Sequence, residues 1–323
     1  MAALVAFAAT CCAQEIQTRE KEFYILLLLM TGGILGAFMS LDIFLMYFLH
    51  ELALVPTFIM IGVWGRGQDK DFAAYKITLY LSLGALLTLA GVIMLYLQFG
   101  TFSLLSMMDH ATQFAGTEAG AFSATEQNVI FALLMFGLGI LVGLWPFHTW
   151  APRGYSAAPT ATAMMHAGVI KKFGLFMLIK VALPLLPQGA QTWLPILALL
   201  CLGNILYCGL VAMRQKDLNL LIGNSSVAHM GFVFLGIASV TTIGLTGAVM
   251  VMVAHGLLAG LAFGLSGYLY SQARTLNMEK LQGLLASMPF WGTLMIMALM
   301  AGCGLPGFAN FAGELTVFFG AWK

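Results

Sequence analysis

The chain has 323 residues, of which 61% are hydrophobic and only 8% are charged, and its formal net charge is +1. Soluble domains carry about 25% charged residues, so this composition excludes a soluble globular protein. With a mean hydropathy of +0.94, it indicates an all-α, polytopic transmembrane helical bundle whose apolar surface faces the lipid bilayer or other membrane helices. The near-zero charge gives no indication of a nucleic-acid partner, and we expect none.

The first segment, residues 1–21, begins with the apolar run MAALVAFAATCC. About twelve apolar residues are too few to cross a hydrocarbon core of about 30 Å. We interpret this segment as the stub of an incomplete helix followed by a loop, with a signal fragment as the alternative. The last segment, GELTVFFGAWK, also stops before a span is finished. We therefore expect the sequence to be truncated at both ends.

Apolar runs of spanning length fill most of the chain between these segments. None alternates like a strand, so all predict helices. They cover residues 22–41, 43–64, 72–98, 126–148, 160–184, 190–213, 218–240, 243–271 and 285–304, and a tenth, shorter run begins near residue 308. The longest connection, residues 101–127, is polar and rich in small residues, which predicts an exposed loop.

Basic residues predict the orientation of these helices. Side A, where the N-terminal segment lies, collects ten of them, and the loops of side B collect none. The ten are Arg19, Lys21, Arg66, Lys70, Lys76, Arg153, Arg214, Lys216, Arg274 and Lys280. Basic loops stay on the cytoplasmic side of a membrane, so we expect side A to be cytoplasmic. The other four basic residues, Lys171, Lys172, Lys180 and Lys323, fall inside predicted helices.

The order of the helices predicts two inverted five-helix repeats, over residues 22–184 and 190–323, the second incomplete at its C-terminus. Late in each repeat a helix is interrupted, by GLWPFHTWAP (143–152) and by GLPGFANFAG (304–313). Paired Gly/Pro breaks in two inverted halves indicate an ion pathway near the middle of the membrane. Lipid cannot replace the backbone hydrogen bonds lost at a break, so we expect both breaks to be buried in protein or wetted.

Five ionisable residues lie near mid-depth, each in a different helix. They are Glu51, Lys172, His229, His255 and Glu314. A charged group at this depth costs at least about 2.5–3.5 kcal/mol. A single buried histidine would be interpreted as a structural residue that joins two helices by a hydrogen bond. Five groups at matched depth favour an ion path. Such a series can pass protons, because burial brings the charged and neutral forms of each group closer in free energy.

The stretch HAGVIKKFG places His166, Lys171 and Lys172 in one apolar helix. At about 100° per residue, Lys171 and Lys172 point roughly 140° and 240° away from His166. One channel cannot receive all three side chains. We therefore expect Lys172 on the path, Lys171 at a helix interface or water pocket, and His166 nearer the cytoplasmic end. Lys180 is expected to extend to side B.

No motif predicts a metal or cofactor in this chain. The five cysteines (Cys11, Cys12, Cys201, Cys208 and Cys303) form no C-x-x-C pattern, which favours small buried residues over metal ligands or disulfides. Neither a Walker loop nor a G-x-G-x-x-G motif occurs. We expect no redox centre, metal or cofactor in the chain.

Several long motifs resemble the antiporter-like M subunit of bacterial complex I and its mitochondrial chain-4 homologue. In chain order they are YFLHELALVPTFIMIGVWG, PFHTWAPRGYSAAPTATAMMHAGVIKKFG, DLNLLIGNSSVAHMGF, VAHGLLAGLAFGLSGYLY and GLPGFANFAGEL. The resemblance, over residues 20–323, implies an inverted-repeat proton channel in the membrane arm of NADH:quinone oxidoreductase, in a cell inner membrane. It also implies that about three helices are missing before residue 20 and two after residue 323. NADH, flavin, iron–sulfur clusters and quinone would be bound by partner subunits.

The resemblance also implies roles for individual residues. Glu51 matches the family's helix-pair glutamate, Lys172 its central lysine, His229 and His255 its connecting histidines, and Glu314 its exit-side acid. The family's lysine before the first break is replaced here by Leu141, which puts the usual partner of Glu51 in doubt. We expect His166 or Lys171 to supply the missing basic group.

Two other transporter assignments share these features. One is a subunit of a stand-alone cation/proton antiporter, and the other is the membrane arm of a membrane-bound hydrogenase. The wording of the motifs favours NADH:quinone oxidoreductase, and the genes beside this one would separate the three. The sequence leaves open whether H⁺ or Na⁺ moves.

Overall fold

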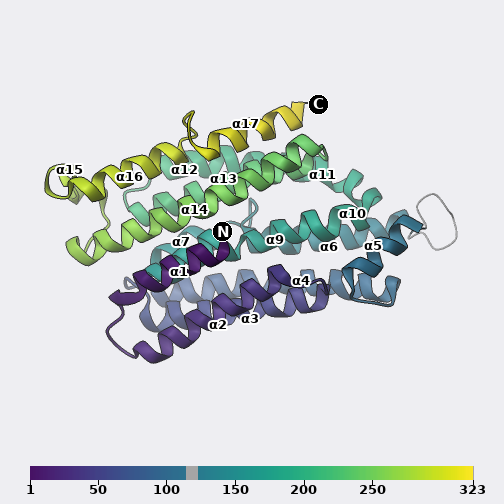
Figure 1. Ribbon diagram of the computed structural model, residues 1–323, viewed down its shortest axis with the longest axis horizontal. Helices are drawn as coiled ribbons and strands as arrows, with labels where there is room; N and C mark the ends of the chain where they lie inside the picture. The colour runs from purple at the N-terminus through teal and green to yellow at the C-terminus, as the bar shows by residue number, and fades with distance from the viewer. Residues whose placement is uncertain (114–122, 323) are drawn as a thin grey trace.

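The computed structural model describes residues 1–113 and 123–322, which form one bundle of helices that lie side by side (Figure 1). Within these residues, seven helices are long and apolar enough to cross a membrane. They are α2 (Glu20–Met39), α3 (Ile43–Trp64), α4 (Lys70–Phe99), α6 (Ala124–Val142), α13 (Leu218–Ala238), α14 (Thr242–Ala273), and one continuous helix made of α11 (Pro187–Leu202), η4 (Gly203–Cys208) and α12 (Gly209–Met213). The predicted all-α transmembrane bundle is confirmed.

The run predicted at 160–184 is a single helical rod whose hydrogen-bond pattern changes along its length; we call it the central helix. It consists of α8 (Thr160–Met165), η2 (His166–Ile170), α9 (Lys172–Met177), η3 (Leu178–Ala182) and α10 (Leu183–Leu185). Both η2 and η3 are π-helical. Such π-helical turns are rare and often occur at functional sites, and here they flank Lys172.

The predicted loop at 101–127 is wrong in part, because α5 (Leu104–Gln113) is helical. Leu104 and Met107 lie on one face of α5 and are buried. This amphipathic pattern folds a short helix against the bundle, although its composition is too polar to span a membrane. Residues 114–122 of the predicted loop lie outside the described residues.

Both predicted helix breaks are present. The helix predicted at 126–148 ends earlier, at Val142, because Gly143 adopts a left-handed φ of 96°, which other residues rarely tolerate. The chain becomes helical again in α7 (Trp150–Ala157). The second break, with left-handed glycines at 304 and 307, separates α16 from α17. The elements around it are η5 (Met278–Lys280), α15 (Leu284–Ser287), α16 (Pro289–Gly302) and α17 (Ala309–Trp322).

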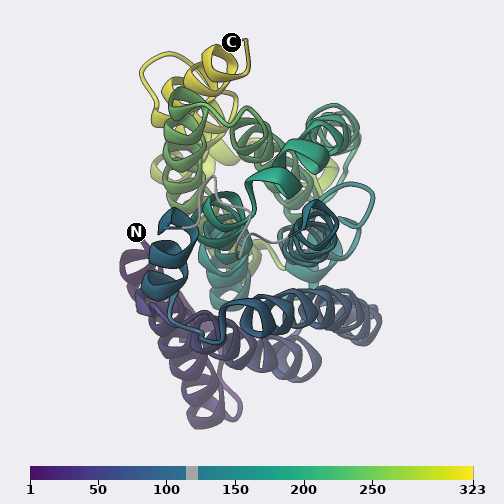
Figure 2. The ribbon, with the colours of Figure 1, turned by 90° about the vertical axis from the view of Figure 1, so that its right-hand side faces the viewer.

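The central helix lies between the early and the late helices of the chain. An end-on view (Figure 2) shows the purple and blue helices α2–α4 on one side and the green and yellow helices α14–α17 on the other. Small residues allow close packing, as lipid-embedded helices require. A Cβ on Gly137 of α6, for example, would lie 2.7 Å from the backbone N of Thr88 in α4.

A partly buried ion pair ties the N-terminal segment, α1 (Ala2–Cys12) and η1 (Ala13–Glu15), to the start of the central helix. The Arg66 guanidinium lies 2.5 Å from Glu15 Oε2 and 4.5 Å from the ring centroid of Tyr270. Glu15 also accepts hydrogen bonds from Thr160 N, at 2.7 Å, and Thr160 Oγ1, at 2.9 Å. Glu15 thus supplies an acceptor that the first turn of the central helix lacks within its own sequence.

Glu15→Ala should destabilise the protein, because Arg66 and the Thr160 N–H would both lose their acceptor. The site is partly buried, so water would replace that acceptor only in part. We expect a loss of about 2 kcal/mol, measured as a lower thermal unfolding midpoint in detergent. The matched control is Glu279→Ala, which removes a Glu–Lys216 pair whose side chains are 63% and 71% exposed. The control should leave the midpoint nearly unchanged, since exposed pairs contribute little. Equal shifts in the two variants would contradict the role given to Glu15.

The basic loops gather at one end of the bundle. Arg66, Arg153 and Arg274 line a common pocket there, and Lys216 pairs with Glu279 at the same end. At the other end, Glu126 forms a capping box with Ser123 at the start of α6. Lys180 is exposed, as expected, and Lys323 lies outside the described residues. Which end faces the cytoplasm remains a prediction from the charge pattern.

Cysteine labelling tests that orientation. In a background with Cys11 and Cys303 replaced by serine, Gln68→Cys and Ala124→Cys place one exposed thiol at each end of the bundle. A membrane-impermeant maleimide should label position 124 in intact cells and position 68 only after permeabilisation. Labelling of both positions from the same side would contradict the predicted topology.

Candidate functional site

Lys172 projects from the central helix toward α14. Its side chain is 1% exposed, and its Nζ lies 2.9 Å from Nδ1 of His255 in α14. The same Nζ donates a hydrogen bond to the carbonyl oxygen of Ala167. Lys172 is therefore in direct contact with a second proton-exchanging group on a different helix.

Lys171 projects in another direction, toward α13. Its Nζ donates hydrogen bonds to the carbonyl oxygen of Ser226, at 3.0 Å, and to the Ser226 hydroxyl. It also lies 5.7 Å from the ring centroid of Tyr155. The two adjacent lysines therefore diverge, as predicted, with Lys171 at a helix interface.

His229 and Glu314 continue the contacts beyond His255. The rings of His229 and His255 are 5.4 Å apart at an angle of 65°, and His229 Nδ1 lies 3.4 Å from Glu314 Oε1. A cavity of about 330 Å³ between α12, α13, α14 and α16 is lined by both histidines. Glu314 Oε2 lies only 2.8 Å from where a Cβ on Gly304 would be, so the glycine of the second break gives the carboxylate room.

Glu51 lies at the other end of the series, on α3. It lines a cavity of about 340 Å³ between α3 and α4, and its side chain is 27% exposed. Its Oε1 lies 3.4 Å from Nδ1 of His50. The His50 ring is stacked on Phe173 of the central helix, with centroids 4.3 Å apart and an angle of 14°. His50 thus connects Glu51 to the central helix.

His166 is buried between the rings of Trp150 and Tyr155, each with its centroid 5.6 Å away. Lys171 and Lys172 follow it five and six residues later on the same helix. In the described part of the chain, neither His166 nor Lys171 lies within 4.0 Å of the Glu51 carboxylate. Lys171 bonds to Ser226 instead, and an approach of His166 or Lys171 to Glu51 through water stays a prediction.

The replaced lysine position, Leu141, is buried on α6 and packs against Gly84 of α4. The basic nitrogen beside Glu51 belongs to His50, which we did not predict. In the sequence, His50 is visible only as the residue next to Glu51 in FLHELAL. Adjacent side chains normally diverge on a helix, so the pair gave no reason to expect a contact.

Asn204 of η4 is a second residue that sequence reasoning missed, and it holds the first break. Its Oδ1 accepts from Trp145 N at 2.7 Å, and its Nδ2 donates to Gly143 O at 2.9 Å and Val227 O at 3.2 Å. The amide thus replaces hydrogen bonds that the interrupted helix lost.

Gly143 and His148 of the first break are buried, but Pro146 is exposed, and residues 305–307 of the second break are exposed. The expected burial within the protein therefore holds for part of the first break only.

Several buried polar atoms of the series have no hydrogen-bond partner within the described residues. They are His50 Nδ1, Glu51 Oε1, both ring nitrogens of His166, both ring nitrogens of His229, and Glu314 Oε1. Most buried polar groups in proteins are hydrogen-bonded. Groups that lie close together with spare donors and acceptors can exchange protons with each other or with water.

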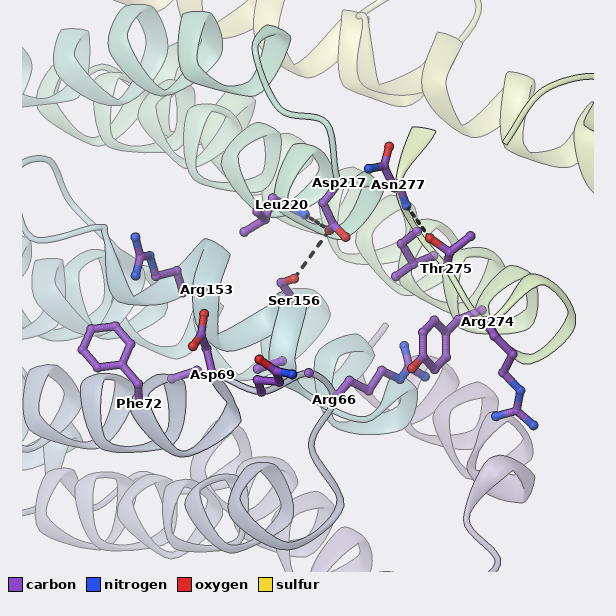
Figure 3. Close-up of a pocket in the computed structure, with 16 residues that line it drawn as sticks. Arg66, Asp69, Phe72, Arg153, Ser156, Asp217, Leu220, Arg274, Thr275 and Asn277 are labelled. Atoms are coloured by element: carbon purple, nitrogen blue, oxygen red, sulfur yellow. Dashed lines mark hydrogen bonds between the residues drawn. The ribbon is translucent and has the colours of Figure 1, made fainter. Parts of the chain in front are cut away.

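A separate pocket of about 550 Å³ opens at the end of the bundle where the basic loops gather (Figure 3). Its wall includes Arg153, Asp217 and Arg274, with Ser156 Oγ 3.5 Å from Asp217 Oδ1. None of the five predicted path residues lines it. In residues 1–113 and 123–322, no group of three or more His, Cys, Asp or Glu side chains is placed to hold a metal ion.

Comparisons with known proteins agree with this geometry. A family model described as "NADH:quinone oxidoreductase/Mrp antiporter, TM" matches residues 40–323. The NADH-quinone oxidoreductase subunit M of Rhodobacter capsulatus is 33% identical over 314 residues, covering 96% of this chain and 61% of that protein. The NAD(P)H-quinone oxidoreductase chain 4 1 of Synechococcus sp. (strain JA-2-3B'a(2-13)) is 35% identical, covering 95% of this chain and 57% of that protein. The chain thus spans about 60% of the length of these relatives.

Solved structures share the fold. A chain in the respiratory complex I from Thermus thermophilus with bound NADH matches with a TM-score of 0.90 and 29% identity, covering all of this chain and 66% of that one. A chain of the Mrp complex from Dietzia sp. DQ12-45-1b matches with a TM-score of 0.86 at 21% identity, covering 99% of this chain and 59% of that one.

Proposed function

Because the chain belongs to the NADH:quinone oxidoreductase/Mrp antiporter family, we propose that it is a proton-translocating subunit in the membrane arm of NADH:quinone oxidoreductase. The observation that carries the proposal is the series of buried and partly buried groups from Glu51 to Glu314, each on a different helix. From Lys172 onward each group is in contact with the next. The similarity to M subunits of this enzyme supports the choice of complex.

Protons would move along this series by transfer between neighbouring groups. The Lys172 ammonium can release a proton to His255 Nδ1 across the 2.9 Å contact, which is within the reach required for direct transfer. His229 then connects His255 to Glu314. The cavities beside Glu51 and beside His229 and His255 offer places where water could exchange protons with the series.

The energy for transport would come from redox chemistry in other subunits, which would bind NADH, flavin, iron–sulfur clusters and quinone. This chain would supply only the proton path, in contact with neighbouring membrane-arm subunits and with lipid. Its place would be a bacterial inner membrane, with the basic loops in the cytoplasm.

A subunit of a multi-subunit cation/proton antiporter is the second candidate, because the same family model describes both kinds of protein. The similarity to the Mrp complex shows the shared fold alone. Transport assays on the complex purified with this chain would separate the two, since only the first couples transport to NADH oxidation.

Glu51→Gln should sharply reduce proton transport while leaving the complex assembled. The amide keeps the shape of the side chain but cannot exchange a proton. We expect a loss on the order of 10²-fold, the usual contribution of an acid–base group, measured as NADH-driven acidification of inverted membrane vesicles. Glu22→Gln, at a side chain that is 53% exposed, is the control and should pump normally. Normal pumping by Glu51→Gln would refute the proposed path.

Lys172→Met should impair proton transport more than Lys171→Met. Both changes remove one buried charge, but only Lys172 contacts another proton-exchanging group, whereas Lys171 donates to Ser226. The same vesicle assay measures both variants, normalised to the amount of assembled complex. Equal effects, or the reverse order, would show that the series does not run through Lys172.

A further inference from the structure

The contact between Glu51 and His50 joins two groups that face different parts of the molecule. The Glu51 carboxylate lines the cavity between α3 and α4. His50 is 1% exposed and faces the central helix, where its ring stacks on Phe173. The pair therefore reaches from this cavity to the central helix.

No other basic group is in position to take this role for Glu51. In the part of the chain that the structure describes, the basic side chain within 4.0 Å of its carboxylate is His50, and no lysine or arginine lies within that distance. Lys171 is directed to Ser226 on α13, and Lys172 to His255 on α14. Leu141, which lies just before the first break, has no proton to exchange.

The two contacting atoms also lack any alternative partner. His50 Nδ1 and Glu51 Oε1 are both buried, and neither has a hydrogen-bond partner within the described residues. An unpaired buried polar atom is costly. At 3.4 Å, the two atoms need only a slight adjustment of either side chain to share one proton, with whichever atom carries it acting as the donor.

A second histidine without a hydrogen-bond partner in the described residues lies on the central helix. Both ring nitrogens of His166 are buried without a hydrogen-bond partner in the described residues, and its ring is otherwise enclosed by Trp150 and Tyr155. Helix α3, which carries His50, packs against η2, the turn of the central helix that begins with His166. Lys172 follows six residues later on the same helix.

We propose that His50 is a catalytic proton carrier between Glu51 and the central helix, and that His166 receives the proton from it. The Glu51 O–H bond breaks as the Nδ1–H bond of His50 forms, and the resulting imidazolium releases its Nε2 proton toward His166. One proton moves inward and Glu51 is left ionised, ready to take another from the cavity. This inference rests on the proposed function and adds the connection between its first and second members.

Two variants of His50 separate proton transfer from packing. His50→Gln keeps a polar side chain that cannot carry a proton, and His50→Phe keeps a ring that can stack on Phe173. Both are measured in inverted vesicles that contain the whole complex, as protons pumped per NADH oxidised and per assembled complex. Both should lose at least about tenfold in pumping, since acid–base groups contribute this much or more. Pumping by His50→Phe within twofold of the wild type would assign His50 a packing role and overturn the inference.

Two further variants complete the test. Phe173→Leu removes the stacked ring but keeps both proton-exchanging groups, so it should retain at least about half of the pumping; a loss as large as that of His50→Gln would overturn the inference. If the His50 variants do not assemble, the pumping of Phe173→Leu still tests whether the stacked ring itself is needed. Thr88→Val, at a buried hydroxyl that bonds to Gly84 of its own helix, should pump normally.

Glu51→Gln in the same assay distinguishes the two proposals. If Glu51→Gln loses pumping and both His50 variants keep it, the path stands and His50 is not part of it. If Glu51→Gln itself pumps normally, the proposed path fails as a whole.

Discussion

Two adjacent lysines in one apolar helix must each find hydrogen-bond acceptors away from water, and the arrangement of the surrounding helices depends on how they do so. Lys172 is directed to His255 on α14 and Lys171 to Ser226 on α13. Both α13 and α14 must therefore lie within reach of side chains from one turn of the central helix. Neighbouring ammonium groups on one wall would repel each other, so their divergence lets both stay in the protein interior.

The length of the helices could be predicted because the bilayer sets it. The runs at 43–64 and 218–240 match α3 and α13 to within two residues, since an apolar run must be long enough to cross the hydrocarbon core. Ends fixed by local backbone conformation were less predictable. The end of α6 depends on the left-handed Gly143, and α5 depends on packing of one apolar face. Neither signal appears in average hydropathy.

The members of the buried series could be found from the sequence because charge at mid-depth is costly. Counting depth selected Glu51, Lys172 and Glu314, and the structure brings Glu51 and Glu314 each within 3.4 Å of a histidine. Asn204 was missed because its amide carries no charge and so does not stand out among the ionisable groups at mid-depth. Its role is visible only where two segments that are 59 residues apart meet. Pairwise contacts of this kind depend on tertiary packing, which a single sequence does not display.

Apart from the stretch of the central helix between His166 and Lys172, the series crosses the bundle from helix to helix. His229 and His255 lie near the middle of α13 and α14, and Glu51 lies in the first half of α3. A charge that moves through the whole membrane potential gains or loses about 2.3 kcal/mol per 100 mV. Steps that run parallel to the membrane plane feel almost none of this. Under the proposed function, membrane voltage would act on the steps that bring protons from and to the two surfaces, and the transfers between helices would proceed at nearly constant electrical potential.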